Sequence, residues 1–166
     1  MCVGKSWYGP GFTPTEQASQ VSLWAVLASP LIVSFDVRNM PPGCKELVTN
    51  PRVIAVHQDK LGKPGKRLLN SPNTNETSLS SDGSIGAQVW GRPLAGGGVA
   101  AAFFNRGESA RDISASFGEL GLVVRQSETV QSVDVWTGAV TRVASSLFVA
   151  RAVPAHAVVF VTLTPQ

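Results

Sequence analysis

The pattern of apolar residues changes near Lys66 and divides the chain into two parts. Before Lys66, a stretch with helical spacing is followed by a short continuous apolar run. After it, short β-like runs follow one another with Gly, Asn and Ser between them. Alternation of helix and strand is typical of βα repeats, whereas regularly spaced short strands with turn residues indicate an antiparallel sandwich. The sequence therefore predicts an α/β segment over residues 1–65 and an all-β domain over residues 66–166.

The first part contains a well-marked helix start. Thr13 can cap the helix, Pro14 suits the first helical position, and Glu16 favours the positive end of the helix dipole. We expect this helix to run from Pro14 to Ala28. One face of it is apolar and carries Val21, Trp24, Ala25 and Ala28, so this face should pack against a sheet.

Three further elements are expected before Lys66. The apolar run Leu31–Phe35 predicts a fully buried parallel strand. A short helix is expected over Gly43–Thr49, and Arg52–His57 reads as a short extended or helical piece. These units are too few to close a (β/α)8 barrel, which needs eight strands and about 250 residues.

After Lys66 the sequence predicts a series of short strands. They are Leu68–Leu69, Ser84–Trp90, Gly98–Asn105, Asp112–Ser116, Val133–Trp136, Val140–Val143, Leu147–Val153 and Ala157–Leu163. In the last of them the apolar and polar residues alternate imperfectly, which indicates burial on both faces.

Bulk properties exclude several classes of protein. The net charge is only +3, and the basic residues are scattered rather than clustered, among them Arg52, Arg92, Arg106, Arg125, Arg142 and Arg151. Nucleic-acid binding needs a clustered basic footprint, so we expect no nucleic-acid partner. The sequence has no run of 18 apolar residues, so no membrane span is expected, and MCVGKSWYGPGF lacks the pattern of a signal peptide.

The cysteines and histidines predict neither a metal site nor a disulfide framework. Cys2 and Cys44 lie in different predicted elements, and we interpret them as buried thiols. His57 and His156 stand without Cys or His neighbours at the spacing that a metal site requires.

Several motifs occur in an order that resembles a known family. SLWAVLASPLI, FDVR and VIAVHQDKLGKPGKRL are followed by QVWGRPLAGGGVAAAFFNRG, DVW and VPAHAVVFVTLTP. In this order they resemble the C-terminal part of the retaining α-galactosidases, which are melibiase-type glycoside hydrolases. The resemblance implies the last βα units of a TIM barrel over 1–65, followed by a C-terminal antiparallel β-sandwich over 66–166.

The resemblance also implies an activity. The parent enzyme would hydrolyse terminal α-linked galactose from oligosaccharides or glycoconjugates by retaining double displacement, which needs a nucleophile and an acid/base carboxyl group. In the family both catalytic aspartates lie upstream of the position of Met1, so we expect this chain alone to be inactive. The resemblance implies an α-galactoside substrate, no metal or organic cofactor, and a parent that is secreted, vacuolar or lysosomal. It leaves a homodimer open.

Candidate site residues follow from both lines of reasoning. Asp36 directly follows the predicted strand at its carboxyl end, where barrel enzymes place functional groups. We interpret Asp36 as a buried residue hydrogen-bonded to Arg38 or to a loop backbone. The resemblance implies that this position supports the substrate pocket from behind rather than acting as a catalytic group. The resemblance implies that Met1 lies beside the sugar. Asn75 begins an N-x-T sequon, a glycosylation candidate in a secreted chain.

Two further features and three alternatives remain open. Trp7 and Tyr8 could stack on a sugar or simply pack. His57-Gln58-Asp59 is interpreted as a backbone-capping turn that joins the two parts. The alternatives to the α-galactosidase interpretation are a non-catalytic carbohydrate-binding or assembly module built on the β-sandwich, an α-N-acetylgalactosaminidase fragment, and an incomplete reading of a longer gene.

Overall fold

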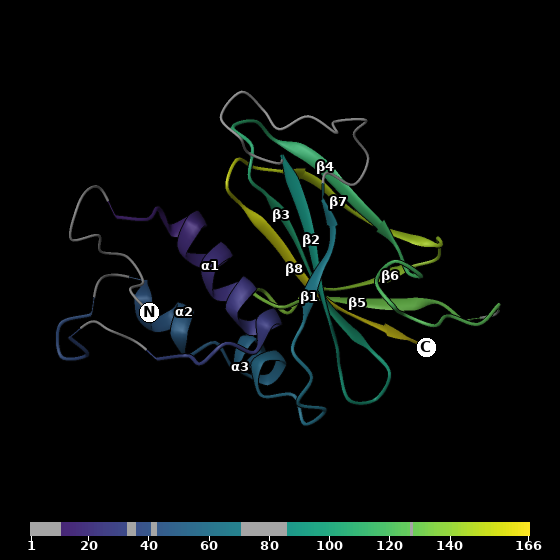
Figure 1. Cartoon of the computed structure of the whole chain (residues 1–166), viewed down its shortest axis with the longest axis horizontal. Coiled ribbons are helices and arrows are strands. Elements are labelled where there is room, and N and C mark those ends of the chain that lie inside the picture. Colours follow the sequence, from purple (N-terminus) through teal and green to yellow (C-terminus); the bar gives the residue numbers. More distant parts are fainter. Residues whose placement is uncertain (1–10, 33–35, 41–42, 71–85, 127) are drawn as a thin grey trace.

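A computed structural model describes residues 11–32, 36–40, 43–70, 86–126 and 128–166 of the chain. Three helices precede eight strands in this part of the chain (Figure 1). The helices are α1 (Pro14–Leu27), α2 (Cys44–Val48) and α3 (Pro51–His57). The strands are β1 (Lys66–Asn70), β2 (Ala87–Pro93), β3 (Val99–Asn105), β4 (Arg111–Ser116), β5 (Val130–Asp134), β6 (Val140–Val143), β7 (Leu147–Val153) and β8 (Val158–Pro165). In the described part of the chain, no helix is long and apolar enough to span a membrane.

Helix α1 begins and ends as its sequence predicts. The Thr13 hydroxyl accepts a hydrogen bond from the Glu16 backbone N–H, while the Glu16 carboxylate accepts one from the Thr13 N–H, so a complete capping box is present. At the other end Ala28 adopts a left-handed conformation, with a φ of 53°. Pro30 follows, which cannot continue a helix.

Helix α3 resolves the ambiguity of the sequence over Arg52–His57. The Asn50 side chain accepts hydrogen bonds from the backbone N–H groups of Arg52 and Val53, and Pro51 occupies the first helical turn. Both features favour a helix over an extended segment.

The predicted parallel strand over Leu31–Phe35 is wrong where the structure describes it. Leu31 and Ile32 are not in a strand, and Ile32 is 70% exposed, while residues 33–35 lie outside the described part of the chain. A buried parallel strand needs neighbouring strands on both sides. None of the described strands pairs with Leu31 or Ile32, since all of them belong to the two antiparallel sheets.

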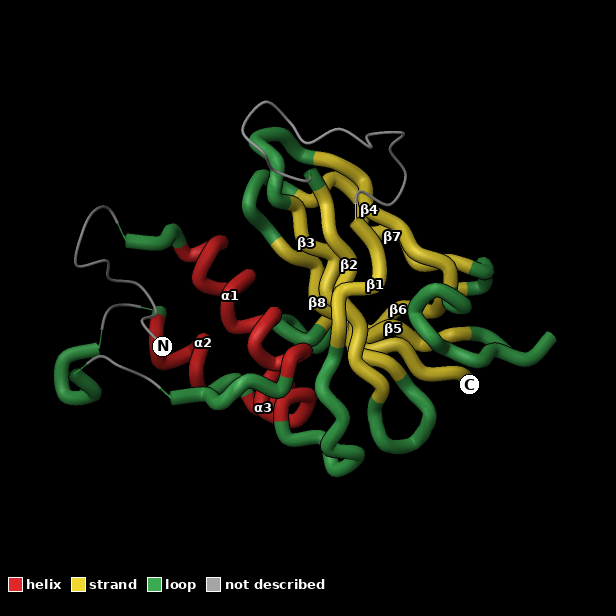
Figure 2. Tube along the Cα trace, viewed as in Figure 1, coloured by secondary structure: helices red, strands yellow, loops and turns green. Residues whose placement is uncertain are grey.

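Two antiparallel sheets form the β-domain. The larger has the strand order β1-β2-β3-β8-β5-β6, and the smaller consists of β4 and β7. Figure 2 shows the helices on one side of the large sheet and the small sheet on its other side. The prediction of an antiparallel sandwich is therefore confirmed, although strand β5 begins at Val130 and ends at Asp134 rather than spanning Val133–Trp136.

The shift of β5 has a local cause. The Asp134 carboxylate accepts hydrogen bonds from the backbone N–H and the hydroxyl of Thr137, at 2.7 and 2.8 Å, and Gly138 has a φ of 80°. Such a side-chain-stabilised turn ends the strand even though the apolar residues Val135 and Trp136 follow. Apolar character alone predicted the wrong boundary.

The large sheet is buried on both faces. One face contributes Val89, Phe103, Val130 and Leu163 to a core shared with β4, β7 and the loop after β4. The other face contributes Ala100, Ala102 and Phe160 to a second core shared with the helices, where Val21, Ala25, Val26, Val53 and Val56 are buried. Burial of strand β8 on both faces, expected from its imperfect alternation, is confirmed.

Candidate functional site

Asp36 and Arg38 form an exposed ion pair in a turn. The Asp36 Oδ1 accepts hydrogen bonds from the Arg38 backbone N–H at 3.0 Å and from its Nε at 2.9 Å, and Arg38 Nη2 donates to Oδ2 at 3.2 Å. The Arg38 hydrogen bonds lower the pKa of Asp36 below the ordinary value of an aspartate. At neutral pH the turn therefore presents a carboxylate held by a guanidinium.

The expected burial of Asp36 is wrong. Its side chain is 50% exposed and that of Arg38 is 88% exposed. The expectation depended on a buried strand ahead of Asp36, and the described residues of that segment form no strand. The contact with Arg38 nevertheless forms as expected, because the two residues are separated by only one position.

Met1, Trp7, Tyr8 and Asn75 lie outside the described residues, as does Cys2. Cys44 is fully buried, and this burial raises the pKa of its thiol. Among the described residues, no three His, Cys, Asp or Glu side chains come together as metal ligands would.

The His57-Gln58-Asp59 segment is a capping turn, as interpreted from the sequence. The Asp59 Oδ1 accepts hydrogen bonds from the backbone N–H groups of Leu61, at 3.0 Å, and of Ala95, at 2.9 Å. His57 Nε2 lies 2.8 Å from the Ser29 carbonyl oxygen. The turn thus connects the end of α3 both to the segment after α1 and to the loop between β2 and β3.

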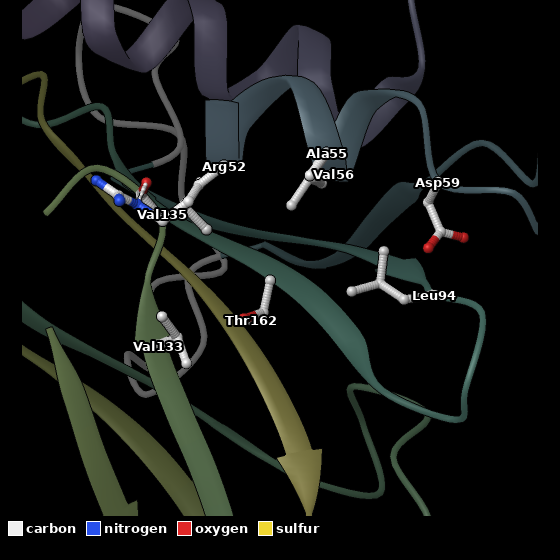
Figure 3. A pocket seen from close by; sticks show the side chains of 8 residues that line it. All are labelled: Arg52, Ala55, Val56, Asp59, Leu94, Val133, Val135 and Thr162. Carbon is white, nitrogen blue, oxygen red and sulfur yellow. Dashed lines mark hydrogen bonds between the residues drawn. The ribbon is translucent and has the colours of Figure 1, made fainter. Parts of the chain in front are cut away.

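A groove of about 270 Å³ lies between α3 and the large sheet (Figure 3). Apolar side chains of Ala55, Val56, Leu94, Val133 and Val135 line it together with Thr162. Arg52 and Asp59 lie at its opposite ends, as Figure 3 shows. Both charged side chains already bond backbone groups: Arg52 donates to the carbonyls of Val135 and Trp136, and Asp59 accepts from Leu61 and Ala95. Because its lining is mostly apolar and its charged residues are already bonded, the groove resembles an interface between packed elements rather than a polar sugar site.

Arg92 has a structural role that the sequence pattern does not reveal. In the sequence it is one of several scattered basic residues, but in the structure it is only 1% exposed and its Nη1 donates to the carbonyls of Ala25, Val56 and His57. One signal was present, because QVWGRPL places the arginine within a predominantly apolar strand. Its partners, 35 to 67 residues away in the sequence, could not be read from that motif.

Comparisons with known proteins match both parts of the chain. Residues 84–163 match the family described as "Alpha galactosidase C-terminal beta sandwich domain", and residues 8–59 match the family described as "Alpha galactosidase A". An α-galactosidase of Cyamopsis tetragonoloba is 35% identical over 94% of this chain and 34% of its own length. One of Coffea arabica is 34% identical over 94% of this chain and 37% of its own.

Solved structures give the same result. The crystal structure of α-galactosidase I from Mortierella vinacea superimposes with a TM-score of 0.77 at 26% identity, covering 98% of this chain and 38% of that one. The chain spans about a third of the length of the curated relatives it matches. The part that it matches includes their C-terminal β-sandwich.

Proposed function

Since the chain belongs to the α-galactosidase family and corresponds to its C-terminal portion, we propose that it is part of a glycoside hydrolase that removes terminal α-linked galactose. The observation that carries the proposal is the order of the two family matches along one chain, over residues 8–59 and then 84–163. In this proposal residues 1–65 belong to the barrel domain and residues 66–166 to the β-sandwich.

The proposed reaction is a retaining double displacement. An aspartate would attack the anomeric carbon, and a second would protonate the leaving oxygen and then activate water. Both aspartates would lie in the part of the family's barrel that precedes the match to this chain. None of the described carboxylates is proposed as either one: Glu16 is engaged in a helix cap, Asp59 in a backbone turn and Asp36 in an exposed ion pair.

Within this proposal Asp36 and Arg38 support the substrate pocket without touching the reacting atoms. The ion pair is the observation behind this proposal. The lowered pKa keeps the Asp36 carboxylate ionised, and the hydrogen bonds from Arg38 to both of its oxygens fix its orientation. Met1 is proposed to lie beside the sugar and Asn75 to be a glycosylation acceptor, both on the family resemblance and the sequon alone.

A chimeric enzyme tests the function. The matching C-terminal region of the Cyamopsis tetragonoloba α-galactosidase, 35% identical, is replaced by this chain, and p-nitrophenyl α-galactoside is the substrate. We expect the chimera to hydrolyse it and the isolated chain to give no turnover above the buffer blank. A folded chimera that is inactive, or one that prefers p-nitrophenyl α-N-acetylgalactosaminide, would contradict the proposal.

The support role of Asp36 is tested in the same chimera. Asp36→Asn should lower kcat/KM, and Arg38→Met should lower it as well, because each variant removes one half of the ion pair. Arg142→Met, which removes an exposed arginine on β6, serves as the control and should leave kcat/KM unchanged. Unchanged kinetics in both Asp36→Asn and Arg38→Met would remove these residues from the site.

A further inference from the structure

Arg92 is a buried cation that contacts two helices from the sheet. It lies in β2, and its Nη1 donates to the backbone carbonyls of Ala25 at 3.0 Å, Val56 at 2.8 Å and His57 at 2.8 Å. Removing an ionised guanidinium from water costs several kcal/mol unless hydrogen bonds compensate. Burial lowers the pKa of Arg92, and the nearby Asp59 carboxylate opposes that shift. The three carbonyls therefore compensate for part of this cost, since the buried Nε of Arg92 has no hydrogen-bond partner among the described residues.

These carbonyls belong to the carboxyl ends of α1 and α3. Ala25 lies in the last turn of α1, and Val56 and His57 end α3. The last carbonyls of a helix have no partner within it, and the helix dipole makes that end partially negative. A single guanidinium thus donates to the ends of two helices that are separated along the chain, where the Ala25 and Val56 carbonyls also accept longer bonds of 3.3 Å from the Ala28 and Asp59 N–H groups.

Other polar contacts join α1 to the β-domain and to Gly65, the residue that precedes β1. The Ser19 hydroxyl donates to the His156 carbonyl at 2.7 Å, and Trp136 Nε1 donates to the Ser22 hydroxyl at 3.0 Å. The Gly65 N–H donates to the Val26 carbonyl at 2.9 Å. All of these contacts surround the apolar core that the helices and the outer face of the large sheet share. Polar and apolar contacts therefore cross the boundary near Lys66 from Ser19 to Val26 of α1.

We propose that α1, α3 and the six-stranded sheet open as one cooperative unit, and that Arg92 is the residue that couples the helices to the sheet. The change of sequence pattern near Lys66 is then a boundary in secondary structure but not in stability. The inference depends on contacts within this chain and is independent of the proposed function.

Amide hydrogen exchange on the whole 166-residue chain tests the cooperative unit. In the wild type, interior amides of α1 (Val21–Val26) and of β3 (Val99–Phe103) should exchange with the same free energy of opening, since both would require opening of the whole unit. Exchange of the α1 amides about tenfold faster than those of β3, or more, would show that the helices open separately and would overturn the proposal.

Substitution of Arg92 tests the coupling. Arg92→Met keeps an unbranched apolar stem but removes the Nη1 donor shared by the Ala25, Val56 and His57 carbonyls. Ala25 and Val56 keep longer bonds of 3.3 Å from the Ala28 and Asp59 N–H groups, so exchange in α1 and α3 should accelerate about tenfold or more. Exchange in β3 and β8 should change much less, because their opposite face retains its own core. Arg92→Lys, which keeps the charge and three donors, should restore part of the protection.

The matched control is Arg142→Met on β6, which removes an exposed arginine and should alter neither region. Equal acceleration in helices and sheet after Arg92→Met would make Arg92 an ordinary packing residue, and no acceleration would make it dispensable. Either result overturns its coupling role. If Arg92→Met does not fold, the wild-type comparison and Arg92→Lys still decide: protection of the helices in Arg92→Lys should be weaker than in the wild type, and equal protection would overturn the role.

Discussion

Individual buried polar residues make tertiary contacts that the sequence pattern does not predict. Arg92 is one example and Asn105 is a second. It is fully buried at the end of β3. Its Nδ2 lies 2.8 Å from the carbonyl oxygen of Ser109, 2.9 Å from that of Val153 and 3.0 Å from that of Pro154, while its Oδ1 accepts from the Gly107 N–H. One amide thereby joins the end of β3 to the end of β7 in the other sheet.

Asn105→Leu should lower the free energy of unfolding by about 3 kcal/mol. The substitution keeps the γ-branched shape, with a larger side chain, but leaves several buried backbone groups without a partner, at about 1–3 kcal/mol for each group that water cannot reach. Urea denaturation measures the difference. Asn39→Leu, at an exposed turn position, is the control and should be nearly neutral. Equal effects of the two substitutions would show that the Asn105 hydrogen bonds contribute nothing to stability.

Glu16 and Glu119 predict how stability depends on pH. The Glu16 carboxylate accepts hydrogen bonds from the Thr13 N–H and hydroxyl, and that of Glu119 accepts them from the Ser116 hydroxyl and N–H. These bonds lower the pKa of both glutamates in the folded state. Their stabilisation is present above the ordinary glutamate pKa, about 4.3, and is lost as the pH falls through the lowered folded values.

The double variant Glu16→Gln, Glu119→Gln should therefore lose less stability than the wild type between about pH 5 and pH 3. Glutamine can still accept the capping hydrogen bonds but does not titrate. Thermal unfolding at a series of pH values gives the comparison. If the Tm of the two proteins falls by the same amount between about pH 5 and pH 3, these caps do not contribute to the pH dependence.

At the scale of elements, the segment between α3 and β1 has one position that tolerates no side chain. A Cβ on Gly65 would lie 2.6 Å from Val26 Cγ1, 2.6 Å from the Val26 carbonyl oxygen and 2.8 Å from that of Gly91. Gly65→Ala should therefore push α1 away from β2 and cost about 1–3 kcal/mol, as overpacked substitutions do. Calorimetry would record a lower Tm.

Gly118→Ala provides a matched control for Gly65→Ala. A Cβ on Gly118 meets nothing within 4 Å. Gly118→Ala should therefore change the free energy of unfolding by no more than about 0.5 kcal/mol, as surface substitutions do, and should leave the Tm nearly unchanged. A Gly65→Ala protein as stable as the control would show that α1 and β2 can separate without cost.

The elements that the sequence predicts are those whose signals are local. The helix-start residues Thr13, Pro14 and Glu16 and the continuous apolar run of β3 each lie within a few residues, and both elements form where expected. The start of β5 was missed because Gln131 and Ser132 interrupt its apolar pattern, although Val130 and Ser132 are buried. At Leu31–Ile32 the error is the opposite one: a strand was predicted where none forms. An apolar run becomes a strand only beside partner strands.

The residues of the candidate site show the same difference between local signals and those that depend on the tertiary structure. Asp36 was expected to bond either Arg38 or a loop backbone, and it bonds Arg38, which lies two positions away. The burial of Arg92 depends on carbonyls in two helices distant in the sequence, so only the folded chain reveals it. Local chemistry predicted contacts, whereas burial required the tertiary structure.

At the scale of the whole molecule, the position of β8 predicts the effect of truncation. β8 pairs with β3 on one side and β5 on the other, and it contributes Phe160, Val161 and Leu163 to the two cores. Removing residues 158–166 should therefore abolish the fold rather than shorten an edge. Near-UV circular dichroism and soluble yield measure the loss, and removal of Gln166 alone is the control. A soluble truncated protein with a native near-UV spectrum would contradict this expectation.

The central place of β8 also bears on the order of events during synthesis. The hairpin of β5 and β6 joins the rest of the large sheet through β8, which is the last described strand to be translated. Until β8 leaves the ribosome, β3 and β5 both present unpaired edges, of the kind that other chains can join. The nascent chain thus depends on β8 to close the sheet, and the edges of β3 and β5 stay vulnerable until β8 has emerged. Chaperone binding to ribosome-bound chains should be strongest just before that point.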